Sequence, residues 1–125
     1  MKKIEDIRTN YKLGFLKKEN LAYSPIIQFQ DWFNEVVGKI LEPTAMTLST
    51  HTKTHGTRSR VVLLKGIKRD GFIFYTNYHS LKGLQIDSNK NVSLSFFWPE
   101  FQRQICINGI AIKTSIKESN NYFKK

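Results

Sequence analysis

The sequence has no long apolar run, only one cysteine, and half as many acidic as basic residues. A helix that spans a bilayer needs about 18 or more apolar residues in a row, so no such segment is predicted. Charged residues follow Met1 where a secretory signal needs an apolar stretch, and we therefore expect a cytoplasmic protein. The lone Cys106 excludes an intramolecular disulfide, and its place in an apolar run predicts a buried, unreactive thiol.

Basic residues are twice as numerous as acidic residues. Twenty Lys and Arg against 10 Asp and Glu give a formal net charge of +10, which predicts an anionic partner. Nucleic acid, an acidic membrane surface and a phosphorylated small molecule satisfy this charge equally well. Because the sequence shows no linker, repeat or low-complexity stretch, residues 1–125 are expected to form a single domain.

The N-terminal third is predicted to contain an arm followed by one amphipathic helix. Residues 1–20 form the arm, in which a short polar helix over 4–12 suits a lid. Ser24 followed by Pro25 is a typical helix start, after which apolar residues recur every three or four positions. The amphipathic helix is therefore predicted over 24–42, just before a proline.

From residue 44 the apolar period changes to two, which predicts consecutive antiparallel strands over 44–114. Such strands favour a closed or half-closed β-barrel, because closure removes exposed strand edges. Asp70-Gly71 is a hairpin signal between the second and third strands, and a capping pattern predicts the start of a C-terminal helix over 115–125. Strands are predicted over 45–51, 59–67, 71–77, 91–98 and 102–113, with a helix over 80–88.

An aliphatic run between two cations marks the predicted strand 59–67, which contains Arg60 and Lys65 at the ends of that run. Two interpretations stay open: the cations bind a phosphate or an electron-rich ring, or both ends of the strand are simply exposed. Strict alternation places the two cations on opposite faces of the strand. Both reach one ligand only if the strand twists, bulges or ends at the site.

The end of the third predicted strand offers hydroxyl groups beside a helix start. Tyr75 and Thr76 lie near the strand end, and Lys82 lies near the first turn of the next helix, where anions bind readily. A capped helix with a surface lysine accounts equally well for these residues. Arg103 and Gln104 add fork-shaped and amide donors that suit the polar edge of a heterocycle.

Two other classes of function are disfavoured by the pattern. A basic nucleic-acid-binding module would need aromatic residues on its surface for base stacking, whereas Phe72 and Phe74 alternate as core residues. His51 and His55 have a spacing that suits a metal site on a helix. Because Gly56 and the β pattern place them around a turn, with no third ligand in view, no metal site is expected.

Several ordered motifs together resemble the pyridoxamine 5'-phosphate oxidase family. The resemblance covers nearly the whole chain and implies an FMN-binding split β-barrel, mainly β with flanking helices and with antiparallel, Greek-key-like connections. It also implies a homodimer with FMN at the subunit interface, which oxidises pyridoxamine or pyridoxine 5'-phosphate to pyridoxal 5'-phosphate and passes electrons to O2. The motifs are Glu42–Met46, Ser59–Lys65, Gly71–Asn77, Ser80 with Lys82, and Glu100–Gly109.

The same resemblance implies roles for individual residues and assigns no catalytic residue. The implied FMN contacts come from three strands and one helix, and the contact from the last strand reaches FMN across the interface. The implied substrate contacts come mainly from the two ends of the chain. The FMN contacts are Arg60, Val61, Val62, Leu63, Leu64, Lys65, Tyr75, Thr76, Lys82 and Gln104. The substrate contacts are Lys65, Tyr122, Arg8 and Tyr11.

Two departures from the family pattern bear on activity. Leu81 stands where the family usually has a second basic residue before Lys82, which predicts FMN binding weakened by about 1–3 kcal/mol. The chain is also expected to be cut short on its C-terminal side, where the family continues with further FMN and substrate contacts. FMN binding should therefore survive better than oxidase activity, and an FMN-binding split-barrel protein without oxidase activity is the alternative function.

Overall fold

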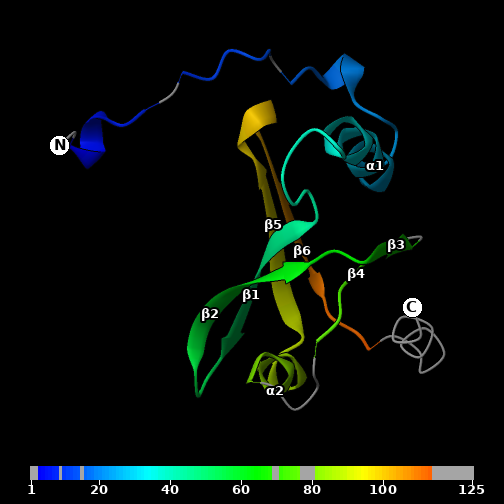
Figure 1. The fold of residues 1–125 in the computed structure, drawn as a ribbon. Coiled ribbons are helices and arrows are strands. Elements are labelled where there is room, and N and C mark those ends of the chain that lie inside the picture. The colour runs from blue at the N-terminus through cyan, green and yellow to red at the C-terminus, as the bar shows by residue number, and fades with distance from the viewer. Residues whose placement is uncertain (1–2, 9, 15, 69–70, 77–80, 114–125) are drawn as a thin grey trace.

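The described residues form one four-stranded antiparallel sheet, one two-stranded sheet and two α-helices, as seen in a computed structural model of the chain (Figure 1). The described residues are 3–8, 10–14, 16–68, 71–76 and 81–113, with only the backbone described for 81–84. The elements are the 3₁₀ turns η1 (Ile4–Asp6) and η2 (Lys18–Asn20), then α1 (Pro25–Val36), β1 (Ala45–Thr52), β2 (Gly56–Leu63), β3 (Gly66–Lys68), β4 (Gly71–Ile73), α2 (Leu81–Ser88), β5 (Asn91–Trp98), η3 (Pro99–Phe101) and β6 (Arg103–Ile110).

The larger sheet has the strand order β2-β1-β5-β6, so β2 and β6 are its two edges. β3 and β4 form the smaller sheet as a hairpin in which Lys68 pairs with Gly71, as the Asp70-Gly71 signal predicts. Figure 1 shows α1 beside one end of the larger sheet and α2 beside the other. None of the described helices is long and apolar enough to cross a membrane.

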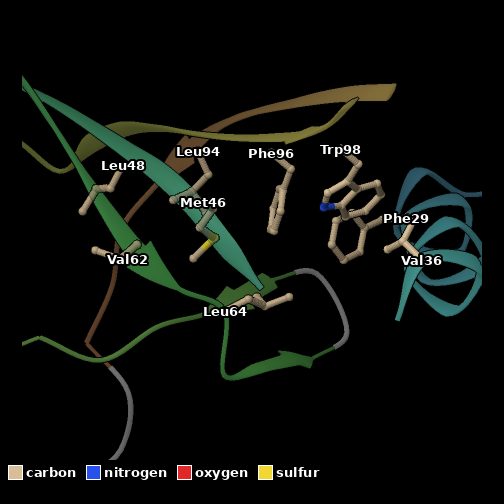
Figure 2. Close-up of a cluster of buried hydrophobic side chains, with 9 residues drawn as sticks. All are labelled: Phe29, Val36, Met46, Leu48, Val62, Leu64, Leu94, Phe96 and Trp98. Carbon is tan, nitrogen blue, oxygen red and sulfur yellow. The ribbon is translucent and has the colours of Figure 1, made fainter. Parts of the chain in front are cut away.

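The core lies on one face of the larger sheet, and strand alternation places it there. In β5, Leu94, Phe96 and Trp98 are buried, as the apolar period of two over this predicted strand indicates. Phe29 of α1 packs its ring 5.1 Å from that of Phe96 and 4.9 Å from that of Phe72. Phe72 and Phe74 therefore pack against the core, as predicted. Figure 2 shows the cluster, Phe29, Val36, Met46, Leu48, Val62, Leu64, Leu94, Phe96 and Trp98.

Two predicted helices are shorter than the sequence pattern suggests. The predicted helix over 4–12 is only the 3₁₀ turn η1, because Ile7 already has an extended backbone. The predicted helix over 24–42 starts as expected, with Ser24 Oγ accepting from the Ile26 N–H at 3.2 Å, but ends at Val36. The chain leaves the helix there because Gly38 adopts φ 79°, a left-handed conformation that glycine tolerates best.

The predicted strand 59–67 is in fact two strands in two different sheets. β2 ends at Leu63. The N–H of Leu64 then donates to the carbonyl of Thr44 at 2.9 Å, and the N–H of Lys65 donates to the carbonyl of Ile73 at 2.7 Å. The strand therefore ends between the two cations of this segment, which is one of the ways in which both can approach one ligand.

The face of the larger sheet opposite the core is here called the outer face. Hydroxyl groups bridge its strands, as in the Ser49 Oγ to Ser59 Oγ contact of 2.9 Å. Cys106 lies on this face opposite Ser95 and is exposed, so its predicted burial is wrong. Its strand β6 is an edge strand, and residue 106 alternates away from the core. Four exposed apolar residues also lie on the outer face, Val61, Leu63, Phe97 and Ile110.

Candidate functional site

Arg60 is the centre of a polar network that joins β2, β1 and α2. Its Nη1 donates to the carbonyl of Leu48 at 3.2 Å and to Thr50 Oγ1 at 2.9 Å. Its Nη2 donates to Gln85 Oε1, which also accepts a hydrogen bond from Thr50 Oγ1 at 3.2 Å. Thr50 and Gln85 are 2% and 1% exposed. The guanidinium is therefore held in a fixed direction by buried neutral groups.

The charge of Arg60 is not balanced within the described part of the chain. The groups that accept its hydrogen bonds are carbonyl, hydroxyl and amide oxygens, and no ion pair to a carboxylate is formed there. Burial lowers the pKa of Arg60 from its ordinary value, yet arginine stays protonated at neutral pH. A partly buried cation with only neutral partners is suited to bind an anion through its remaining donor capacity.

The contact between Arg60 and Gln85 also fixes the position of α2. This helix packs against β1 and carries Lys82 in its first turn, one turn before Gln85. Backbone N–H groups at a helix N-terminus favour an anion. The structure therefore brings Arg60 to the helix that holds Lys82, as the predicted FMN site requires; the Lys82 side chain lies outside the described part.

The remaining predicted residues of this segment fall into two sets. Val62 and Leu64 are buried in the core, so only their backbone groups are available to a ligand. Val61 and Leu63 are exposed on the outer face, at 66% and 41%. Lys65 is also exposed and follows the end of β2. Residues 61–65 thus offer backbone, apolar and basic groups to a ligand, at the connection between the larger sheet and the smaller one.

β4 ends at Ile73, so the predicted strand 71–77 is too long and Tyr75 and Thr76 lie beyond the strand; both are partly buried. The β3–β4 hairpin is joined to the end of β2 by the hydrogen bond from Lys65 to Ile73. This connection attaches the segment with the two hydroxyl groups to the smaller sheet that follows β2. Their contacts with a ligand stay a prediction.

Gln104 lies away from this group within one chain. It is exposed on β6 and pairs with Phe97, on the outer face. Because β2 and β6 are separated by two intervening strands, roughly 14 Å separates their axes at about 4.8 Å per strand. A single chain therefore does not bring Gln104 together with Arg60.

The other three predicted substrate residues lie on the N-terminal segment or outside the described part. Arg8 and Tyr11 are exposed on the N-terminal segment, which extends away from the larger sheet (Figure 1). Gln102 contacts this segment, because its Oε1 accepts from the Leu13 N–H at 3.0 Å. Tyr122 lies outside the described residues, as does the predicted C-terminal helix.

Other candidate ligand groups are engaged within the protein. Arg103 Nη1 lies 2.7 Å from Glu35 Oε2, and its guanidinium carbon lies 4.6 Å from the centre of the Trp32 ring. Arg103 therefore joins β6 to α1 and is not directed at a ligand. At the β1–β2 turn, His51 and His55 contact threonine hydroxyls. Throughout the described ranges, no group of three or more potential metal ligands occurs.

Sequence reasoning missed Thr50 and Gln85 as members of the site. A signal for Thr50 was present, because it continues the alternation of Met46 and Leu48 on the buried face of β1. A buried hydroxyl needs a polar partner, and Arg60 is paired with Leu48 in the next strand. Gln85 gave no such signal, since only the packing of α2 on β1 brings it to this point.

Comparison with known sequences gives a consistent result. The family profile described as pyridoxamine 5'-phosphate oxidase matches residues 33–125. The pyridoxine/pyridoxamine 5'-phosphate oxidase of Leptospira interrogans is 47% identical over 122 residues, and that of Bordetella pertussis is 45% identical over 121. These matches cover 97% and 96% of this chain but 57% and 58% of the relatives. The chain thus spans just over half the length of the curated relatives it matches.

Comparison with solved structures supports the fold. PhzG from Burkholderia lata, solved in complex with tetrahydrophenazine-1-carboxylic acid, matches with a TM-score of 0.80 and 28% identity, covering 89% of this chain and 57% of that one. A pyridoxamine 5'-phosphate oxidase-related, FMN-binding protein from Nostoc punctiforme matches with a TM-score of 0.64 and 15% identity, over 82% of this chain and 56% of that one. The predicted fold class, an antiparallel and mainly β split barrel, is confirmed.

Proposed function

The chain belongs to the pyridoxamine 5'-phosphate oxidase family, and from this premise we propose that it binds FMN and serves the oxidation of pyridoxamine or pyridoxine 5'-phosphate to pyridoxal 5'-phosphate, with O2 as electron acceptor. The observation that carries the proposal is the partly buried Arg60, whose described partners are all neutral, next to the helix that holds Lys82. This donor set fits an anionic, heteroaromatic cofactor.

The residues of the candidate site fit FMN in two ways. Arg60 and Lys82 supply positive charge and α2 supplies a helix N-terminus, which together suit a phosphate. The backbone of residues 61–64, at the end of β2, would lie along the ring, with Tyr75 and Thr76 offering hydroxyl groups. Lys65, together with Arg8, Tyr11 and Tyr122, would bind the phosphate and the body of the substrate. FMN, when bound, supplies a ring that accepts hydride, so the chain's own residues need only hold and orient the reactants.

We further propose that two copies of the chain assemble through their outer faces. Val61, Leu63, Phe97 and Ile110 are exposed there at 66%, 41%, 56% and 70%, and burying such residues stabilises an interface. The same assembly would bring Gln104 of the partner subunit to the cofactor, which one chain does not achieve. The FMN site would then be shared between the subunits.

Phe97→Asp is expected to convert this homodimer into a monomer. A carboxylate at the centre of an apolar interface would lose its hydration, at a cost of about 2 kcal/mol or more. Sedimentation velocity measures the change directly. Leu41→Asp is the matched control, because Leu41 is 93% exposed and lies outside the outer face. If Phe97→Asp and Leu41→Asp both leave the dimer intact, the outer face is not the interface.

The proposed function is tested by titrating the purified chain with FMN while flavin fluorescence is followed. Pyridoxamine 5'-phosphate is then added without oxygen, and bleaching of the flavin absorption band is recorded. Saturable binding with bleaching supports the full proposal. Binding without bleaching would assign an FMN-binding split-barrel protein without oxidase activity. Absence of binding would contradict the proposal. Another anionic partner, such as a nucleic acid, would then be the better explanation of the net positive charge.

A further inference from the structure

The buried amide of Gln85 is a prominent feature that the proposed function leaves unused. Gln85 is 1% exposed in α2, and its Oε1 accepts hydrogen bonds from both Thr50 and Arg60. Its Nε2 is also buried and has no hydrogen-bond partner among the residues that the structure describes. Oε1 therefore accepts two hydrogen bonds, while Nε2 donates none among the described residues.

The direction of the amide follows from the donors and acceptors around it. Arg60 has only donors, so the group that faces it must be an acceptor. Thr50 Oγ1 accepts from Arg60 at 2.9 Å and so has its own hydrogen available for Gln85 Oε1. Turning the amide over would set its NH₂ group against the Arg60 guanidinium, which has only donors. Nε2 therefore stays without an acceptor for as long as Oε1 holds Arg60.

An unsatisfied buried donor destabilises a folded protein, and such exceptions are expected where a side chain is needed for function. We infer that Gln85 is a positioning residue which, together with Thr50, fixes the Arg60 guanidinium in the direction of the bound anion. The inference rests on the proposed function, because it requires Arg60 to contact FMN. Gln85 itself need not touch the ligand. It acts by restricting the conformations of the long Arg60 side chain before FMN binds. Less conformational entropy is then lost on binding, which raises the affinity.

The test compares FMN binding by the full chain carrying Gln85→Met, Gln85→Glu or the control Gln30→Met. Gln85→Met keeps the size of the side chain but removes the acceptor, and its Kd for FMN should rise by about 10-fold. Gln85→Glu keeps an acceptor for Arg60 but places a carboxylate against it, so its Kd should also rise, because the charge of Arg60 is then balanced within the chain. Gln30 is exposed on α1, and its substitution should leave the Kd unchanged. Circular dichroism of each variant before titration confirms that it is folded.

A second set of measurements separates positioning from a merely structural role. In an Arg60→Leu background, Gln85→Met should change the Kd by less than about 2-fold, since the residue through which it acts is gone. Without FMN, Gln85→Glu should raise the urea midpoint above that of the parent, because its carboxylate forms an ion pair with the partly buried Arg60. A lower urea midpoint for Gln85→Met with an unchanged Kd would overturn the inference, as would full additivity with Arg60→Leu.

Failure of the proposed function would look different. The unsubstituted chain would then not bind FMN at all, which overturns the proposed function and this inference together. If the unsubstituted chain binds FMN and Gln85→Met binds it equally well, only the inference about Gln85 is overturned.

Discussion

Arg60→Leu should weaken FMN binding by about 10- to 100-fold, the loss expected when charge-assisted hydrogen bonds worth roughly 1.5–3 kcal/mol are removed. Arg60 is expected to contribute strongly to FMN affinity, because its guanidinium is partly buried and already held by Thr50 and Gln85. Binding of FMN then costs little further conformational entropy of this side chain. Titration of FMN fluorescence measures the change. Leucine also removes the donor to Thr50 Oγ1 and one of the two donors to Gln85 Oε1, so urea unfolding must show that the variant is folded under the titration conditions.

Arg58→Leu is the matched control for this prediction. Arg58 lies on the same strand and the same face as Arg60, two residues away, but its side chain is exposed. Both substitutions remove one positive charge from a chain of formal net charge +10. Arg58→Leu should change the Kd by less than about 3-fold, since exposed charges are screened by solvent and salt. Equal losses in the two variants would show that overall charge, and not the held guanidinium, attracts FMN.

Strand positions were predictable where the signal is local. Alternation over 91–98 follows directly from the order of apolar and polar residues, and β5 has these bounds and this register. The Asp70-Gly71 signal similarly predicted the hairpin of β3 and β4. Such features depend on residues that are neighbours in sequence, so the pattern alone contains the information needed.

Features that depend on distant partners were not predictable. The break between β2 and β3 results from backbone hydrogen bonds of Leu64 to Thr44 and of Lys65 to Ile73, and no local residue signals it. The exposure of Cys106 depends on β6 being an edge strand, which is a property of the sheet order. The early end of α1 did have a local signal in Gly38, but the apolar period continues past it to Ile40 and masked that signal.

The candidate site likewise contains residues that the sequence predicted and residues that it did not. Arg60 and Lys82 were predicted from charge placement and family resemblance, and the structure brings Arg60 to the helix that carries Lys82. Gln85 and Thr50 were missed, because their role depends on how α2 packs on β1. Arg60 is marked in the sequence as a cation beside an aliphatic run. Gln85 carries an ordinary polar side chain, and its role becomes visible only through burial and hydrogen bonding.

Phe96→Ala is expected to lower the free energy of unfolding by about 3–5 kcal/mol, the usual loss when a buried aromatic ring leaves a cavity. Phe96 is fully buried, with ring centres of Phe29 and Trp98 at 5.1 and 5.7 Å. Urea unfolding followed by tryptophan fluorescence measures this loss, because Trp98 adjoins the cavity. A domain of this size has a total stability of roughly 5–15 kcal/mol, so Phe96→Leu, with a smaller cavity, keeps the measurement in range.

Phe97→Ala provides the comparison, since Phe97 is the next residue in β5 but is 56% exposed on the outer face. For an isolated subunit its loss should cost less than about 1 kcal/mol. If outer faces associate, the cost of Phe97→Ala should increase with protein concentration, because association adds stability by mass action. The cost of Phe96→Ala should be independent of concentration, because its contacts lie within one chain. Equal costs for the two variants at every concentration would contradict the assignment of core and outer face to alternate residues of β5.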